Sequence, residues 1–221
     1  MVLSPHADDA ELGAGGYIGR VTAQGGEVMV VLATAGASNH IETGASALAD
    51  QRIAEFQAAM RVLGVQQQHI LTQGLDGELH AFPRSSFVKL LDDLQAEFEP
   101  DEILLPLPSS HQDHTYCWET GIAMTRPKSP KLLPSLVAGY EYPLSGWGPG
   151  AAFNNCKGGL YVDITASWEL KLAALRQHAS QLGNRAGLVS IEAVEALAHW
   201  RGLEAGYRRA ELFHIVRQRW D

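Results

Sequence analysis

Two short segments of this 221-residue chain combine histidine with aspartate, and each comes where a predicted strand ends. The first reads SPHADDAE and begins at Ser4. His6 and Asp9 are three positions apart, so a turn can direct both side chains at one ion. An imidazole nitrogen and a carboxylate oxygen are common zinc ligands. Asp8 points elsewhere, which leaves a carboxylate beside the metal that can take a proton from a metal-bound water.

Simpler interpretations exist for this segment. Aspartate is a favoured N-cap residue, so one of the pair can cap the helix that follows, but this explains neither the second aspartate nor His6. The glycines in ELGAGGYIG invite a dinucleotide-binding interpretation, whose fingerprint needs glycine at its first, third and sixth positions. Gly13 and Gly15 fit, but Ile18 takes the sixth place. Close packing of a helix on a sheet explains these glycines better.

The second segment, SHQDH, follows the predicted strand EILLP. A catalytic zinc usually has three protein ligands and one open position, and either His111 or His114 suffices as the third ligand. The other histidine can donate a proton or a hydrogen bond to the reacting group, with Asp113 orienting it through its second ring nitrogen. Zinc is the expected metal, and a site with two histidines and one carboxylate also holds Fe(II).

Short β-branched runs alternate with longer amphipathic stretches along the chain, which predicts an α/β, Rossmann-like fold with a mostly parallel sheet and helices on both faces. The carboxyl ends of parallel strands meet at one edge of such a sheet, so both segments should converge there. We expect residues 1–221 to form a single domain. The predicted strands are 1–4, 27–34, 69–72, 102–106, 136–141, 160–164 and 211–217. The predicted helices are 9–24, 47–63, 83–97, 114–125, 167–181 and 190–206.

Composition excludes several classes of protein. The chain has 17 Lys+Arg against 25 Asp+Glu, a formal net charge of −8, which argues against a nucleic-acid partner because that needs a basic face. Its two cysteines are too few for a disulfide framework and fit a reducing, cytoplasmic setting. No apolar run reaches the roughly 20 residues of a membrane span, and the first residues lack the pattern of a signal peptide. The C-terminal stretch RGLEAGYRRAELF can serve a homo-oligomer.

Taken together, the motifs resemble a known family. SPHADDAELGAGG is similar to the Pro-His-Pro-Asp-Asp-Glu signature of the zinc-dependent N-acetylglucosaminyl deacetylase family. That family includes phosphatidylinositol N-acetylglucosamine deacetylases and the deacetylases of mycothiol and bacillithiol biosynthesis. HQDH resembles its His-x-Asp-His segment. The resemblance runs along the full chain, with further counterparts in QRIAEFQAAMRVLGV, GLDGEL, YEYP, YVDIT, the SQ at Ser180–Gln181 and RGLEAGYRRAELF.

The resemblance implies a function for each residue of the two segments. The implied zinc ligands are His6, Asp9 and His114. Asp8 would be the general base, and His111 would stabilise the tetrahedral intermediate or protonate the leaving amine. Asp113 would orient a histidine. We therefore expect a zinc-dependent hydrolase that removes the N-acetyl group from an N-acetylglucosamine-containing small molecule or glycoside and releases acetate.

Substrate contacts are implied as well. Arg52 would contact the sugar or a phosphate on it, and Asp76 and Glu141 would line the pocket. Four aromatic residues can either stack on a sugar or pack a loop: Tyr140, Tyr142, Trp147 and Phe153. The chain departs from the family pattern at Ala7, Ala10 and Ser109, the last of which replaces a tyrosine found in some relatives.

Two other functions remain open from the sequence. One is a related amidase that acts on a larger acyl amide, such as a thiol conjugate or an antibiotic. The other is a non-catalytic module that binds a metal or a nucleotide. An unligated Asp8 beside the metal speaks against the second, because binding alone does not need it.

Overall fold

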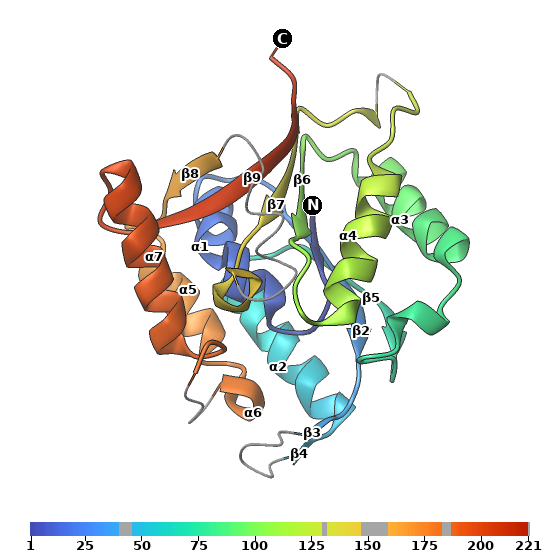
Figure 1. The fold of residues 1–221 in the computed structure, drawn as a ribbon, viewed down its shortest axis with the longest axis horizontal. Coiled ribbons are helices and arrows are strands. Elements are labelled where there is room, and N and C mark those ends of the chain that lie inside the picture. Colours follow the sequence, from blue (N-terminus) through green and yellow to red (C-terminus); the bar gives the residue numbers. More distant parts are fainter. Residues whose placement is uncertain (40–45, 130–131, 147–158, 183–186, 221) are drawn as a thin grey trace.

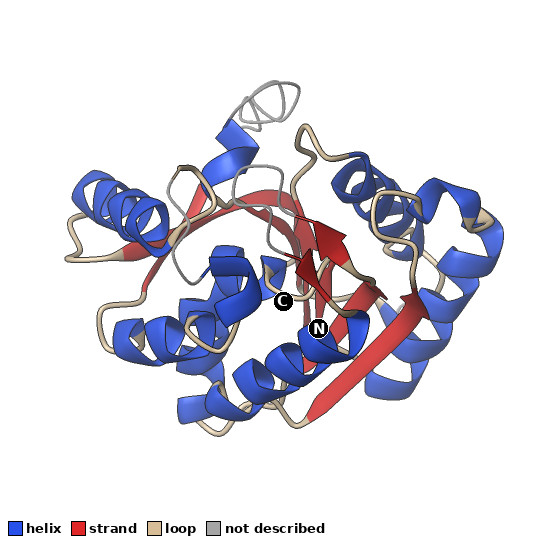
Figure 2. Cartoon of the chain, turned by 90° about the horizontal axis from the view of Figure 1, so that it is seen from below, coloured by secondary structure: helices blue, strands red, loops and turns tan. Residues whose placement is uncertain are grey.

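A seven-stranded sheet forms the centre of the molecule, with helices on both of its faces (Figures 1 and 2). The computed structural model describes residues 1–39, 46–129, 132–146, 159–182 and 187–220. The strand order is β5-β2-β1-β6-β7-β9-β8. These strands span β1 Val2–Ser4, β2 Met29–Ala35, β5 Gln67–Gln73, β6 Glu102–Pro106, β7 Leu136–Tyr140, β8 Gly159–Asp163 and β9 Ala210–Gln218. A separate antiparallel pair is formed by β3 Ser38–Asn39 and β4 Ser46–Ala47.

The pairing confirms the mostly parallel sheet that the sequence predicts. Strands β5, β2, β1, β6 and β7 are parallel neighbours, whereas β9 runs antiparallel to both β7 and β8. Every residue of β2 is buried, as expected for a strand covered by helices on both faces. The short strand β1 lies between β2 and β6, with Val2 opposite both Val30 and Leu104. The carboxyl ends of β1, β6 and β7 therefore lie side by side.

The helices divide between the two faces. One apolar cluster packs α1, α2 and α5 against the sheet, and a second packs α3 and α4 against the opposite face. Their bounds are α1 Asp9–Ala23, α2 Ala49–Val62, α3 Arg84–Phe98, α4 Gln112–Met124, α5 Trp168–Leu175, α6 Ala179–Leu182 and α7 Ile191–Ala205. Short 3-10 helices in the described part of the chain include η1 Leu79–Ala81 and η3 Pro143–Gly146. Among the described residues, no helix has both the length and the apolar character to cross a membrane.

One predicted helix is divided. The sequence predicts a helix over 167–181, but the structure ends α5 at Leu175 and begins α6 at Ala179. Between them lies His178, whose side chain is fully buried and whose Nε2 atom is 2.9 Å from Oε1 of Glu11. The chain turns inward at His178 to form this pair, and this turn interrupts the predicted helix.

The glycines of α1 allow close contact with the sheet and α5. A Cβ atom on Gly13 would lie 2.2 Å from Cδ2 of Tyr140, and one on Gly16 would lie 2.7 Å from Ile164. Neither contact leaves room for a side chain. This confirms the packing explanation of these glycines, and nothing in their placement requires a dinucleotide.

A buried ion pair between α5 and β9 holds α1 in place. The Lys171 ammonium donates to Oε1 of Glu211 (2.7 Å) and to the carbonyl oxygen of Leu12 (2.9 Å). The Glu211 carboxylate accepts the backbone N–H groups of Gly16 (2.8 Å) and Tyr17 (2.7 Å). Because α5 and β9 supply the pair, the C-terminal part of the chain holds the helix that begins within the first histidine–aspartate segment.

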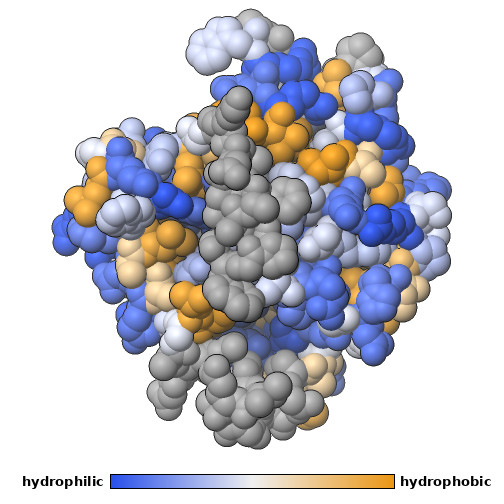
Figure 3. All heavy atoms as spheres, in the orientation of Figure 1, coloured by the Kyte–Doolittle hydropathy of each residue, from blue (hydrophilic) through white to orange (hydrophobic). Residues whose placement is uncertain are grey.

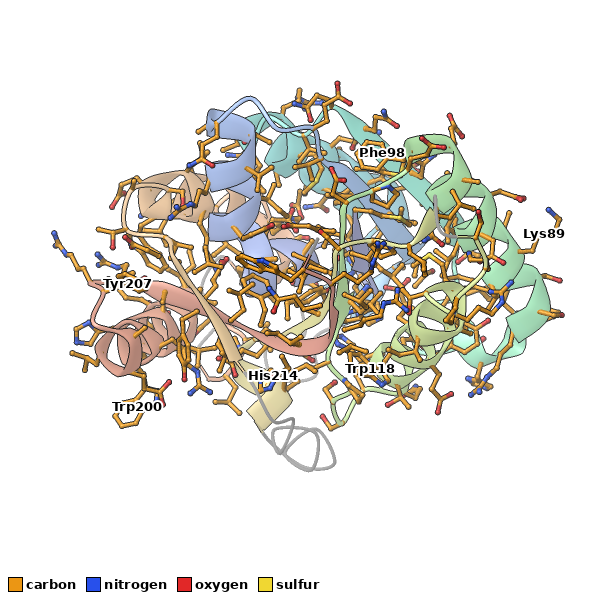
Figure 4. The ribbon with its side chains drawn as sticks, turned by 90° about the horizontal axis from the view of Figure 1, so that it is seen from above. Lys89, Phe98, Trp118, Trp200, Tyr207 and His214 are labelled. Atoms are coloured by element: carbon orange, nitrogen blue, oxygen red, sulfur yellow. The ribbon has the colours of Figure 1, made fainter. Side chains whose placement is uncertain are left out.

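The outer surface is mainly hydrophilic on the face that Figure 3 shows, with apolar residues scattered across it. Helix α7 is an exception, since Trp200 is 59% exposed and Leu203 is 63% exposed. Trp200 points away from the body of the molecule (Figure 4). Leu203 belongs to the stretch RGLEAGYRRAELF, for which the sequence predicts a homo-oligomer, and Trp200 directly precedes it; that expectation stays a prediction.

Candidate metal centre

The two histidine–aspartate segments meet at the carboxyl edge of the sheet. His6 lies in the turn after β1, and His114 lies in the first turn of α4, which follows the neighbouring strand β6. The Ser4 hydroxyl secures the first turn, because it donates to the carbonyl oxygen of His6 (2.7 Å) and accepts from the backbone N–H of Ala10 (3.0 Å). Parallel topology brings the segments together as predicted.

Three donor atoms converge at this edge. Oδ2 of Asp9 is 3.1 Å from Nδ1 of His6 and 3.2 Å from Nε2 of His114. A tetrahedral zinc with ligand distances of about 2.0 Å places its ligand atoms about 3.3 Å apart. All three residues are buried, and their nitrogen and oxygen atoms form a group that fits a metal ion. The donor set therefore suits a divalent cation.

Charges in the cluster also favour a cation. Burial alone would lower the pKa of His6, but hydrogen bonds to Asp113 and Asp9 outweigh it and raise that pKa to about 10. Burial alone would raise the pKa of Asp9, but His114 and His6 hold it well below 3.8. The carboxylates thus stabilise positive charge at this point, which a proton or a metal ion can supply.

Asp113 contacts the ring nitrogen of His6 that does not face Asp9. Its Oδ2 atom accepts from Nε2 of His6 (3.0 Å) and from the backbone N–H of Gly77 (2.6 Å), while Oδ1 accepts from the N–H of Leu79 (3.2 Å). The sequence predicts this carboxylate against the non-ligating histidine, but Nδ1 of His111 lies 4.0 Å away. The N–H groups of the loop after β5 direct it to His6 instead.

A second group of possible ligands shares His6. His6, His111 and Asp113 also lie close enough to hold a metal ion. Their proximity has another explanation, since the carboxylate already accepts from one histidine and from two backbone N–H groups. A histidine ligand that donates its other nitrogen to a carboxylate is the usual arrangement around a metal. The first group is therefore the better candidate.

His111 presents one ring nitrogen to the site. It is the N-cap residue of α4, and its Nδ1 atom accepts the backbone N–H of Asp113 (3.3 Å). In the neutral ring, the proton then resides on Nε2. Burial, together with the positive charges of His6 and His114, lowers the pKa of His111. Its side chain is 41% exposed, so a ligand can reach it.

Asp8 lacks the contacts that hold its neighbours. It is only 8% exposed, and as the N-cap residue of α1 it makes no side-chain capping bond. Among the described residues, no hydrogen bond or ion pair holds its carboxylate, in contrast to those of Asp9 and Asp113. The simpler interpretation, in which an aspartate side chain caps the helix, therefore does not account for it.

Tyr142 is a site residue that the sequence did not single out from the other aromatics. Its ring stacks on the His114 ring, with centroids 5.0 Å apart and planes inclined by 26°. Tyr140 instead is fully buried and donates to the carbonyl oxygen of Leu3 (2.9 Å). Trp147 and Phe153 lie outside the described residues. The segment YEYP lies at the end of β7, the strand next to β6. If the residues at the carboxyl end of this third strand had also been considered as site candidates, the sequence would have identified Tyr142.

The predicted substrate residues occupy different surroundings. The Arg52 guanidinium forms an ion pair with Asp76 and donates to the carbonyl oxygen of Gly36 (2.9 Å). The Asp76 side chain is 17% exposed, against 4% for Arg52, so the carboxylate is the more accessible partner. Asp76 is also next to Gly77, whose N–H holds Asp113.

Glu141 is held by α7. Its carboxylate accepts from Nε (2.5 Å) and Nη2 (2.9 Å) of Arg201. His214 lies beside the same carboxylate, with Nε2 at 3.9 Å from Oε2 (Figure 4 labels His214 on β9). The structure thus places Asp76 by the candidate centre and turns the Glu141 side chain onto α7.

A Rossmann-like sheet with a His–Asp–His cluster at its carboxyl edge places this chain among α/β proteins with a candidate catalytic metal centre. Within that class, it belongs to the PIG-L family. The model of this family, described as GlcNAc-PI de-N-acetylase, matches residues 1–125. Its enzyme class is accordingly that of an N-deacetylase, a hydrolase of amide bonds.

Relatives of this chain agree with that assignment. It is 30% identical over 224 residues to the diacetylchitobiose deacetylase of Thermococcus kodakarensis, covering 98% of this chain and 82% of that protein. The structure of N,N'-diacetylchitobiose deacetylase from Pyrococcus horikoshii, in complex with its inhibitor MPG, superposes with a TM-score of 0.74 at 26% identity, covering 97% of this chain and 82% of that one. The 4-carboxy-2-hydroxymuconate hydratase from Pseudomonas putida KT2440 shares the fold, with a TM-score of 0.75 at 20% identity and coverage of 100% and 96%.

Proposed function

We propose that this protein is a zinc-dependent hydrolase that removes the N-acetyl group from an N-acetylglucosamine-containing small molecule or glycoside, giving acetate and a free amine. The observation that carries this proposal is the convergence of His6, Asp9 and His114, next in the chain to an Asp8 whose carboxylate binds none of them. The deacetylases among its relatives support the choice of reaction. An amino-sugar substrate is the only partner that the proposal needs.

The metal would be held by Nδ1 of His6, Oδ2 of Asp9 and Nε2 of His114. When bound, it supplies a Lewis acid that polarises the amide carbonyl and makes the attacking water more acidic. Zinc suits this set of nitrogen and oxygen donors, and Fe(II) is the alternative that the same donors accept.

Asp8 is proposed as the general base. It accepts a proton from the attacking water, which needs a carboxylate oxygen that no fixed donor occupies. Asp8 meets this requirement, whereas Asp113 is saturated by His6 and two backbone N–H groups. Asp113 acts through His6, whose ring it orients.

His111 is proposed as a donor to the oxyanion. The family resemblance allows two functions for it, stabilising the intermediate or protonating the amine. The N–H of Asp113 occupies Nδ1, so Nε2 is the nitrogen that carries a proton toward the ligand. A neutral imidazole N–H stabilises negative charge on the acetyl oxygen as that charge develops, and one such donor typically contributes 10²–10³ in kcat.

Substrate binding is proposed for Asp76, Arg52 and Glu141. The accessible Asp76 carboxylate can accept hydrogen bonds from sugar hydroxyls, and Arg52 fixes its position. Glu141 would reach a substrate only by sharing its carboxylate with Arg201. We also propose that residues 1–221 act as one domain, since β9 and β8 complete the sheet and the Lys171–Glu211 pair of α5 and β9 holds α1. A cytoplasmic setting fits the free, buried thiol of Cys117.

The proposal is tested by acetate release from a panel of N-acetylglucosamine glycosides, with larger acyl amides alongside them, after loading with Zn²⁺ or Fe²⁺. We expect activity on the glycosides that chelation abolishes and metal restores. Asp8→Asn should retain its metal and lose nearly all turnover, whereas Asp93→Asn, an exposed exchange on α3, should behave as wild type. Full activity in Asp8→Asn would exclude the general-base assignment. Activity on larger acyl amides alone would favour the related amidase.

A further inference from the structure

The Tyr142 hydroxyl lies at the edge of His114 that faces the metal ligands. Its oxygen is 3.5 Å from Nε2 of His114. That same nitrogen is 3.2 Å from Oδ2 of Asp9. The two rings stack with their planes inclined by 26°, and the hydroxyl lies closest to the imidazole at Nε2, the nitrogen that also contacts Asp9.

The surroundings of Tyr142 hold this hydroxyl in place. The residue is 3% exposed. Its backbone is fixed by Ser145, whose hydroxyl accepts the N–H of Tyr142 (3.2 Å) and donates to its carbonyl oxygen (2.7 Å). The Ser109 side chain lies within hydrogen-bonding reach of the phenol. A donor fixed in advance needs little reorganisation when charge develops beside it.

The hydroxyl needs another acceptor once the centre is loaded. In the described residues, the nitrogen acceptor within its reach is Nε2 of His114. When that nitrogen ligates a cation, its lone pair is no longer available to accept. Ser109 can donate to the phenol oxygen, which leaves the phenol O–H free to point toward the ligand cluster. The oxygen of a bound substrate is the acceptor that would arrive there.

We propose that Tyr142 is a further catalytic residue, whose O–H donates a hydrogen bond to the acetyl oxygen of the substrate as that oxygen becomes negative. This inference rests on the proposed deacetylation. The phenol keeps its proton throughout, and the proton from the attacking water goes to Asp8, which passes it to the amine nitrogen as the C–N bond breaks. Tyr142 and His111 then form a pair of donors to one oxyanion, contributed by the ends of β7 and β6.

The test compares Tyr142→Phe with wild type. The phenylalanine keeps the stack on His114 and removes only the hydroxyl. We expect kcat/KM for acetate release to fall by about 10²–10³, with the zinc content per chain unchanged. The matched control is Tyr140→Phe, which removes the hydroxyl bonded to Leu3 and should leave kcat/KM and zinc content unchanged.

A second readout does not depend on the identity of the substrate. Methylphosphonate is a tetrahedral anion that resembles the hydrated acetyl group, and its affinity for the zinc-loaded protein is measured by calorimetry. Loss of a donor to a charged acceptor should raise its Kd by about tenfold or more in Tyr142→Phe. Tyr140→Phe should bind it as wild type does.

Three results would overturn the inference. The first is a Tyr142→Phe protein that keeps wild-type affinity for methylphosphonate, and the second is a wild type that does not bind this anion. The third is a loss of zinc in proportion to the loss of activity, since Tyr142 would then only position His114. Failure of the proposed function can be distinguished from failure of this inference. In that case wild type would release no acetate from any amide, whereas the affinity for methylphosphonate would still show whether the Tyr142 hydroxyl donates to a bound anion.

Discussion

Asp113→Asn should weaken metal binding although Asp113 is not itself in the proposed ligand set. Both carboxylate oxygens accept hydrogen bonds, from His6 and Gly77 on one side and from Leu79 on the other. An asparagine of the same size keeps one acceptor and replaces the other with an NH₂ group. In either orientation, that group faces an N–H donor, so at least one buried hydrogen bond becomes a contact between two donors.

The size of the effect follows from these contacts. Losing a hydrogen bond to a charged group costs about 1.5–3 kcal/mol, and leaving a buried donor unsatisfied costs about 1–3 kcal/mol. We therefore expect the free energy of unfolding to fall by about 3 kcal/mol. Without a carboxylate, the His6 ring loses both its orientation and part of its basicity. Changes of this kind typically weaken metal binding by about 10–100-fold.

The pH dependence of stability provides a second signature. Burial alone would raise the pKa of Asp113, but the hydrogen bonds from His6 and Gly77 outweigh it and leave the pKa below 3.8. A carboxyl group with a lowered pKa stabilises the fold above its unfolded pKa, and this stabilisation is lost as the pH falls through the folded value. Asparagine does not titrate. The unfolding midpoint of wild type should therefore decline more steeply than that of Asp113→Asn between about pH 5 and pH 3.

Two measurements check this prediction. Competition with a chromophoric chelator gives the metal affinity, and urea unfolding at several pH values gives the stability. Asp93→Asn is the matched control, because Asp93 is 60% exposed and pairs only with Lys89 along α3 among the described residues. An Asp113→Asn protein with wild-type metal affinity would refute the argument that this carboxylate orients His6.

Three further substitutions test other parts of the structure. Arg52→Gln removes the ion pair that fixes Asp76 and should raise KM for the sugar by about tenfold, because a hydrogen bond to a charged group is worth about that factor. The zinc content should stay constant. An unchanged KM would argue against this substrate site. Lys171→Met leaves the Glu211 carboxylate buried without its cation, which should cost about 3–5 kcal/mol in urea unfolding, and adding Glu211→Gln should recover part of the loss. Gly13→Ala forces a Cβ into the neighbouring ring and should cost about 1–3 kcal/mol; thermal unfolding at the wild-type temperature would contradict the packing argument.

Much of the fold follows from the sequence because its elements have strong periodicity. All seven strands of the main sheet match predicted ones within a few residues, and the prediction for β6 matches at both ends. The pair β3–β4 was missed because strands of two residues show no alternation. The division between α5 and α6 was missed for a different reason. It depends on the pairing of His178 with Glu11, which are 167 residues apart.

The candidate site was predictable as far as topology alone determines it. Parallel strands bring the ends of β1 and β6 together, and this brings His6 and His114 to one carboxylate oxygen. Topology does not reveal which atoms a side chain contacts. The attachment of Asp113 to His6 depends on two N–H groups of the loop after β5, and the spacing of HQDH contains no information about that loop.

The three aspartates of the site differ in the hydrogen bonds that their carboxylates accept, and their order along the chain does not predict this difference. Asp9 accepts from two histidines and the N–H of His6, and Asp113 accepts from one histidine and two N–H groups. A carboxylate held by three donors is fixed as an anion, which suits a metal ligand or a residue that orients one. A proton acceptor has the opposite requirement, because each fixed donor stabilises the anion and lowers its basicity. Asp8 is the aspartate without such donors among the described residues, so it is the one that can accept the proton from water.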